Sequence, residues 1–267
     1  MKIVRCVVLL LALTSLTANA ELRDLVPEET LKVIAEETSG EAAKRNLDTV
    51  TLQHRMRSGA QFDNASQHIF EMLKSYGLDE VEFLHYPADG KTMFGTQKSR
   101  PVWDVRSAEL WELDNENGVT RRARRLGDWE SVPLSLAQDS LSADVTAALV
   151  DIGPGLTEAD YRGKNVKGKL VLTDSQPEAV VELAVGKFGA AGIISYAPNQ
   201  RSAWWKEDDR LVRWGHLDSF PKTRSFGFMI SLGEARKLQQ RMAAGEEILL
   251  HARVDASHGQ GEYRFVT

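Results

Sequence analysis

The stretch VKGKLVLTDSQPEAVVELAVGKFGAAGIISYA, residues 166–197, decides the fold of this chain. A Gly-Lys turn at 168–169 leads into the apolar run 170–172, which predicts a short buried strand. Small residues followed by two isoleucines, at 190–194, predict a second strand that packs closely against the helix before it. The stretch therefore predicts a strand–helix–strand unit.

The helix between these two strands has a start signal and a stop signal. Ser175 and Glu178 have the spacing of a capping box, and Pro177 suits the first helical turn. Gly189 is placed to end the helix in the left-handed conformation. The positions expected on the apolar face of the helix are Val180, Leu183, Ala184 and Phe188.

This unit resembles the centre of a protease-associated (PA) domain, in which a Gly-Lys-apolar strand, a helix and an Ala/Gly cluster follow in the same order. The resemblance continues with a strand at 228–231, a helix at 232–244 and a closing strand at 245–254. The chain differs at 173–175, where Thr-Asp-Ser stands in place of the Arg-Gly-rich turn of many PA domains. The fold expected for the whole chain is α+β. A small helical and two-stranded front segment precedes a PA-type β-sandwich or open barrel with flanking helices.

Composition limits the class of protein. The chain has 267 residues, of which 42% are hydrophobic and 27% charged, as expected for a soluble globular protein with one or two cores. The formal net charge of −5 argues against a nucleic-acid partner. The only basic cluster, at 121–125, is interpreted as a solvated loop.

The first 20 residues have the pattern of a signal peptide. Basic residues precede an apolar stretch, 7–16, that is too short for a mature membrane anchor. Ala-Asn-Ala at 18–20 is a small-x-small cleavage site, so Glu21 is expected to be the first mature residue. We therefore expect an exported protein, periplasmic or extracellular. The only cysteine, Cys6, lies in the removed segment, so no disulfide supports the mature fold.

Helical patterns come first in the mature chain. Helices are expected over 28–38, 41–56 and about 64–76. The alternating run 81–86 predicts a half-buried strand, and a second alternating run, 108–113, is its expected partner.

This opening resembles the start of the mature enzymes in metallopeptidase family 28, which are zinc aminopeptidases and carboxypeptidases. The resemblance rests on Ser39-Gly40 and on the phrase Leu-Lys-Ser-Tyr-Gly-Leu at 73–78. Many members carry a PA domain inserted before the zinc-binding half, and the order here is the same. The implied parts are a signal peptide (1–20), a front segment (21–131), a PA-like domain (132–256) and a truncated lead-in to the absent catalytic half (257–267).

The family's zinc site is incomplete in this sequence. The family needs two zinc ions, held by a His-x-Asp motif, a bridging Asp, a Glu-Glu pair, another carboxylate and a final His. His216-Leu217-Asp218 spells the first motif, but no Asp occurs between Asp218 and Asp255 to bridge the ions. Asp63 stands upstream of His216, against the family order, and Glu246-Glu247 begins the expected closing strand. We therefore expect no catalytic residue, no metal ligand and no cofactor in this chain, with zinc only in the absent half.

The function expected from the resemblance is that of the non-catalytic front portion of an exported zinc-dependent exopeptidase, inactive alone. Its expected partners are the catalytic half and a peptide or protein ligand. The long insertion 198–226 is the expected binding surface, because aromatic and arginine side chains on long loops concentrate binding energy. Its candidate residues are Trp204, Trp205, Arg213 and Trp214. Two alternatives remain: these tryptophans pack the insertion onto its own domain or onto the absent catalytic half, or the chain is a free-standing PA-type binding module.

Overall fold

The computed structural model describes residues 26–38, 40–55, 58–116, 119–197 and 208–267. The chain forms two compact units, Met1–Thr49 and Val50–Thr267. Helix α2 (Glu28–Glu37) lies in the first unit, and α3 (Gly40–Thr51) begins there. Both match the expected helices, although α3 ends five residues before position 56.

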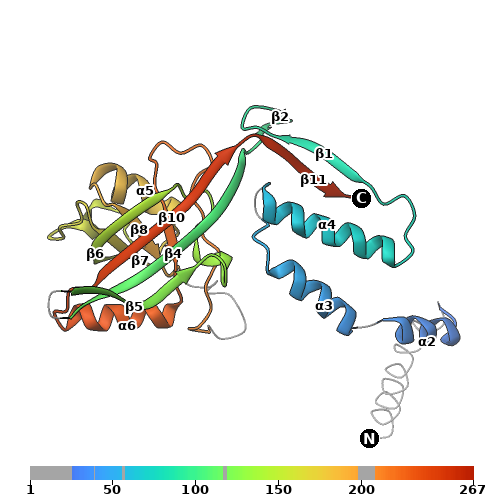
Figure 1. Ribbon diagram of the computed structural model, residues 1–267, viewed down its shortest axis with the longest axis horizontal. Helices are drawn as coiled ribbons and strands as arrows, with labels where there is room; N and C mark the ends of the chain where they lie inside the picture. The colour runs from blue at the N-terminus through green and yellow to red at the C-terminus, as the bar shows by residue number, and fades with distance from the viewer. Residues whose placement is uncertain (1–25, 39, 56–57, 117–118, 198–207) are drawn as a thin grey trace, which may run out of the picture. The chain divides into compact units, whose positions relative to one another are not determined.

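The second unit contains a seven-stranded mixed sheet in the order β5-β4-β10-β6-β7-β8-β9 (Figure 1). Strands β5, β4, β10 and β6 pair antiparallel, whereas β6, β7, β8 and β9 pair parallel. The strands are β4 (Val102–Glu116), β5 (Val119–Asp128), β6 (Ala143–Gly153), β7 (Leu170–Thr173), β8 (Gly192–Ser195), β9 (Gly227–Met229) and β10 (Leu249–Gly259). Helices and mixed sheets together confirm the α+β class. The sheet runs across the expected boundary at Val132, because β4 and β5 pair within it.

The strand–helix–strand unit forms where the sequence predicts it. All residues of β7 and β8 are buried, as expected for interior parallel strands. The helix between them consists of α5 (Pro177–Val181) followed by a π-helical segment, Glu182–Lys187. Gly189 has a φ of +71°, which confirms the left-handed end of the helix.

The predicted capping box is wrong. The residue at the N-cap is Gln176, and no side chain accepts a hydrogen bond there. The Glu178 amide instead donates to the backbone oxygen of His216 at 3.0 Å, and the Glu178 carboxylate contacts the His216 ring. The free amide at the start of the helix is thus satisfied by a distant backbone carbonyl, which makes a side-chain cap at Ser175 unnecessary.

Helix α6 (Leu232–Ala243) packs on the sheet. Its N-cap is Ser231, whose hydroxyl accepts from the Glu234 amide at 3.3 Å. Ala235 and Leu238 are fully buried in the same core cluster as Phe228 of β9. The helix is amphipathic, and its apolar stripe therefore closes the main core. Two short 3₁₀ turns, Pro133–Ser135 and Glu158–Tyr161, complete the regular structure around the sheet.

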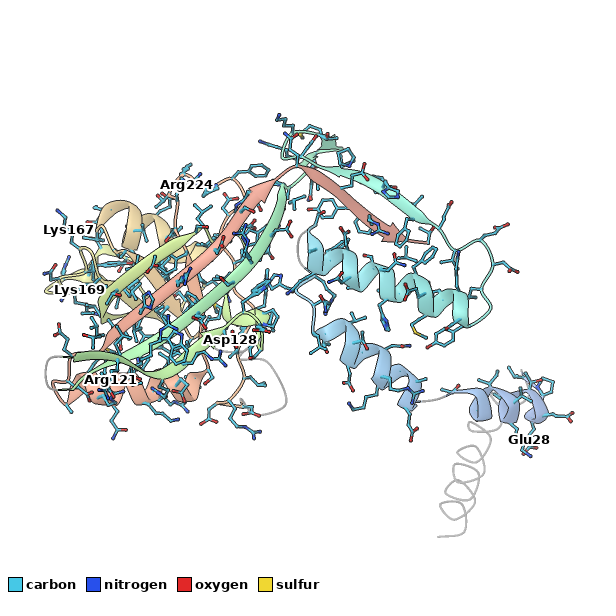
Figure 2. The ribbon with its side chains drawn as sticks, viewed as in Figure 1. Glu28, Arg121, Asp128, Lys167, Lys169 and Arg224 are labelled. Atoms are coloured by element: carbon cyan, nitrogen blue, oxygen red, sulfur yellow. The ribbon has the colours of Figure 1, made fainter. Side chains whose placement is uncertain are left out.

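The basic run 121–125 lies in strand β5, so its interpretation as a solvated loop is wrong (Figure 2 labels Arg121 and Asp128 on this strand). Arg124 binds the buried Glu112 carboxylate at 2.8 Å, and Arg241 of α6 contacts the same carboxylate. The run therefore ties the edge strand to β4 and to α6. An isolated carboxylate at this depth would be costly without these partners.

A separate two-stranded sheet joins distant parts of the chain. Strand β1 (Phe83–Ala88) pairs antiparallel with β11 (Gly261–Val266), and α4 (Ala60–Ser75) packs on β11 (Figure 1). The predicted pairing of 81–86 with 108–113 is wrong, because 108–113 belongs to β4, between β5 and β10. A small hairpin, β2 (Met93–Phe94) and β3 (Gln97–Lys98), follows β1.

Within the described residues, no helix is both long and apolar enough to cross a membrane.

Candidate functional site

Described residues of the insertion between β8 and β9 line a cavity together with residues that follow these two parallel strands. The described part of the insertion starts at residue 208, so the expected residues Trp204 and Trp205 lie outside the described residues. Arg213 lines a small cavity of about 140 Å³. The other lining residues come from the insertion and from the ends of β8 and β9: Tyr196, Ala197, Asp208, Leu211, Val212, Ile230 and Leu232. This cavity is smaller than the range of about 300–1,000 Å³ typical of small-molecule sites, so it suits a single side chain of a ligand.

Trp214 packs onto its own unit. Its indole stacks on the His216 ring, with centroids 4.6 Å apart and planes 10° apart. The Gln176 side-chain amide donates to the Trp214 backbone oxygen at 3.3 Å. Trp214 therefore anchors the insertion on the start of α5, and for this one tryptophan the contact agrees with packing of the insertion onto its own domain. Trp214 is not among the residues that line the cavity at Arg213.

His216 holds the insertion to the segment after the first 3₁₀ turn. It forms an isolated parallel bridge with Gln138. The backbone amide of Gln138 donates to the Gly215 carbonyl at 2.9 Å, and the backbone amide of Leu217 donates to the Gln138 carbonyl at 2.8 Å. A Cβ atom on Gly215 would lie 2.1 Å from the Met229 sulfur, so only glycine allows this close approach to β9. The end of the insertion is thus a fixed part of the fold.

A buried carboxylate that the sequence did not single out lies beside this bridge. Asp139 is 2% exposed and has a φ of +62°. The Asp139 carboxylate accepts from the side-chain amide of Gln138 at 2.9 Å, from the Ser219 hydroxyl at 3.0 Å and from His258 Nε2 at 3.1 Å. Ser219 and His258 both form hydrogen bonds with the Asp139 carboxylate. Ser219, His258 and Asp139 therefore do not form a catalytic relay, in which the histidine would contact the serine hydroxyl to activate it as a nucleophile. A lone Asp in a Gln-Asp-Ser context gave no sequence signal for this network.

The residues of the incomplete zinc motif are held by other partners. His216 contacts Glu178, and the Asp218 carboxylate accepts from the Phe220 amide at 2.9 Å. Asp63 lies in α4, where burial raises the pKa of its carboxyl. Glu246 pairs with Arg241, and this hydrogen bond lowers the pKa of Glu246. Across the described part of the chain, no group of three His, Cys, Asp or Glu side chains is arranged to hold a metal ion.

The two-stranded sheet presents a second exposed surface. Each of its strands has one edge without a partner strand among the described residues. Large apolar side chains of α4, its C-cap residue Tyr76, β1 and β11 are exposed: Ile69, Tyr76, Leu84, Tyr86 and Phe265. Trp111 does not belong to this surface: it lies on β4, beneath the guanidinium groups of Arg122 and Arg125.

Similarity to known proteins is structural. No family model matches the sequence, and no curated protein matches it. A peptidase M28 precursor from Shewanella amazonensis has a TM-score of 0.51 at 15% identity, covering 83% of this chain and 49% of its own. An aminopeptidase from Aneurinibacillus sp. strain AM-1 has a TM-score of 0.42 at 23% identity, covering 86% of this chain and 48% of its own. BSAP, a zinc aminopeptidase from Bacillus subtilis, has a TM-score of 0.46 at 16% identity, covering 82% of this chain and 45% of its own.

The chain spans about half the length of these solved structures. The likeness to the Shewanella precursor reaches most of this chain and shows a fold shared with a peptidase. These three solved structures are thus a peptidase M28 precursor, an aminopeptidase and a zinc aminopeptidase.

Proposed function

We propose that this chain is the non-catalytic front portion of an exported zinc-dependent exopeptidase and that its large sheet is a PA domain. The observation that carries the proposal is the fold shared with the Shewanella peptidase M28 precursor, of which this chain covers 49%. The described residues hold no metal-binding group of their own. Two zinc ions and the hydrolytic chemistry they support would accordingly come from a separate catalytic half.

The two-stranded sheet is the proposed docking surface for that half. Unpaired strand edges offer rows of free amide and carbonyl groups to a further strand. A two-stranded sheet is marginal alone and gains stability from added strands or covering elements. Leu84 and Phe265 are 37% and 46% exposed, so covering each of these side chains would stabilise the complex by roughly half or less of the 1.5–3 kcal/mol gained by burying a fully exposed one.

The proposed role of the PA domain is to shape access of a peptide or protein to the catalytic half. Arg213 lines the small cavity beside β8 and β9, where it is placed to meet one side chain of a ligand. Trp214 and His216 fix the insertion that carries Arg213. In this proposal Arg213 contacts the ligand, and Trp214 positions the insertion.

A free-standing secreted binding module is the second candidate. The observation in its favour is the large sheet, which has its own core and its own buried ion-pair network at Glu112. Such a protein needs no second half for folding.

Sequencing the genomic DNA beyond the codon for Thr267 distinguishes the front portion of a peptidase from a free-standing binding module. We expect it to encode, in some frame, a zinc-binding half that starts with a His-x-Asp strand. Co-expressed with the mature chain and supplied with zinc, this half is expected to hydrolyse leucine p-nitroanilide. The mature chain alone should be inactive and retain well under one equivalent of zinc after dialysis.

A matched pair of variants locates the docking surface. Leu84→Asp is expected to weaken association of the two halves, because it places a charge on exposed strand β1. Leu156→Asp introduces the same charge at another exposed position, beside the large sheet (Leu156 is 52% exposed and Leu84 37%), and should leave association unchanged. Unrelated downstream DNA, or hydrolysis by the mature chain alone, would overturn the proposal.

Export is part of the proposal, although the signal segment 1–20 lies outside the described residues. Mass spectrometry of the exported protein is expected to find Glu21 at the N-terminus. A soluble exported protein that still begins at Met1 would contradict this.

A further inference from the structure

The side of the two-stranded sheet near the hairpin is hollowed into a groove of about 490 Å³. We call it the aromatic groove, defined by its lining residues Tyr86, Phe94, Gln97, Lys98, Ser99, Arg100, Tyr263 and Phe265. Its volume falls within the range of about 300–1,000 Å³ that is typical of binding sites. It is more than three times the size of the cavity at Arg213.

Four rings form the floor and one wall of the groove. Tyr86 lies opposite Tyr263 in the strand register, and its ring meets those of Phe94 at 5.8 Å and Phe265 at 5.7 Å. Tyr263 stacks on Phe265 with centroids 5.8 Å apart. Tyr86, Phe94 and Phe265 are 40%, 42% and 46% exposed. Contiguous exposed aromatic rings of this kind mark interaction sites, because water solvates them poorly.

The hairpin that forms the wall is fixed in place. The Ser99 hydroxyl donates to the Pro87 carbonyl at 2.5 Å, and the Ser99 amide donates to Thr92 at 2.7 Å. The Asp89 carboxylate accepts from the amide and hydroxyl of Thr92 and from the Lys91 amide, and these bonds lower the pKa of Asp89 to about 2. The groove is therefore largely preformed, which reduces the ordering cost of binding.

The charged residues that line the groove are all positive. Lys98 and Arg100 contribute two cations, and none of the lining residues is acidic. The Lys98 ammonium lies 4.2 Å from the centre of the Phe220 ring, which holds it beside the groove. An apolar floor next to two cations is complementary to a segment that has large apolar side chains and a carboxylate beside them.

We propose that the aromatic groove binds an apolar segment flanked by acidic residues, supplied by the catalytic half. This inference rests on the proposed function, which provides the partner, and adds the chemistry of the contact. The rings bury the partner's apolar side chains, and Arg100 and Lys98 pair with its carboxylates. Arg100 is the stronger contributor, because its planar guanidinium binds a carboxylate through two parallel hydrogen bonds.

Two labelled peptides test the chemistry on the mature chain. The probe is acetylated, amidated Glu-Leu-Phe-Leu-Glu, and the comparison peptide is Lys-Leu-Phe-Leu-Lys. Fluorescence anisotropy is expected to show at least about tenfold tighter binding of the acidic peptide, a difference that shrinks at high salt. Equal affinity for the two peptides, or binding of neither, would overturn the proposal.

Paired variants locate the binding. Phe94→Ser removes a groove ring, whereas Met93→Ser alters the neighbouring exposed residue outside the lining. Arg100→Glu reverses a groove cation, whereas Lys91→Glu makes the same kind of charge change elsewhere on the hairpin. The groove variants are expected to weaken binding of the acidic peptide by roughly tenfold or more, and the control variants by less than about twofold. Equal losses in the groove and control variants would place the binding elsewhere.

The outcomes separate the two proposals. Peptide binding without any zinc-binding half in the downstream DNA would retain the groove and reject the peptidase partner. Association of two halves without selectivity for the acidic peptide would retain the partner and reject the groove chemistry.

Discussion

Replacement of Phe228 by alanine is expected to lower the free energy of unfolding by about 3–5 kcal/mol. Phe228 is fully buried on β9 and is among the largest side chains of the main core. Its ring lies 6.4 Å from that of Phe226, and its backbone bridges Leu136. Loss of the ring leaves a cavity at the point where the edge of the sheet meets the segment that carries Asp139. Urea denaturation followed by tryptophan fluorescence measures the change.

Phe220→Ala provides the matched control, because Phe220 is 39% exposed and its main ring contact is the Lys98 ammonium. Its loss is expected to cost less than about 1 kcal/mol, in the range of an exposed cation–π pair. Similar losses for the two variants would show that β9 is not part of the main cooperative core.

The strand–helix–strand unit was predictable because its signals are local. Residues 170–172 form a continuous apolar run between turn residues, and Gly189 occupies the one position where the helix needs a positive φ. Val180 and Ala184 recur at helical spacing, and both are fully buried. Each of these features needs only its neighbours in sequence.

Strand partners were not predictable in the same way. The runs 81–86 and 108–113 both alternate, and so does 261–266, so alternation alone does not choose between partners. Residues 83–88 pair with residues 261–266, which lie 173–183 positions further along the sequence. The prediction of the capping box was wrong for a related reason. The backbone carbonyl that accepts from the first turn of α5 belongs to His216, which is distant in the sequence.

The candidate site was predictable only in part. Aromatic and arginine residues in a long insertion pointed to Arg213 and Trp214, and the structure places Arg213 at a cavity and Trp214 against the His216 ring. Asp139 was missed, because its network depends on Ser219 and His258, which no sequence spacing connects to it. The aromatic groove was missed as well, since its lining residues come from 86–100 and from 263–265, which are far apart in the sequence.

Gly192→Ala is expected to lower the free energy of unfolding by about 1–3 kcal/mol, the usual cost of overpacking a core. The small residues at 190–194 were expected to let the strand pack closely against the helix. The atoms nearest to a Cβ built on Gly192 belong instead to the ring of Phe226. An added Cβ would lie 2.4, 2.7 and 2.8 Å from three atoms of that ring. Phe226 is 3% exposed and belongs to the main core, so the ring cannot move without disturbing its neighbours.

A double-mutant cycle with Phe226→Leu tests whether this ring is the cause. The smaller side chain makes room for the new methyl group, so Gly192→Ala should cost less in the Phe226→Leu background, with a coupling energy of roughly 0.5–3 kcal/mol. Gly259→Ala is the matched control, because a Cβ there meets no atom within 4 Å and the residue lies at the end of β10. Strictly additive effects at positions 192 and 226 would contradict the contact. Additivity would instead place the cost of Gly192→Ala in the backbone of β8, at the centre of the strand–helix–strand unit.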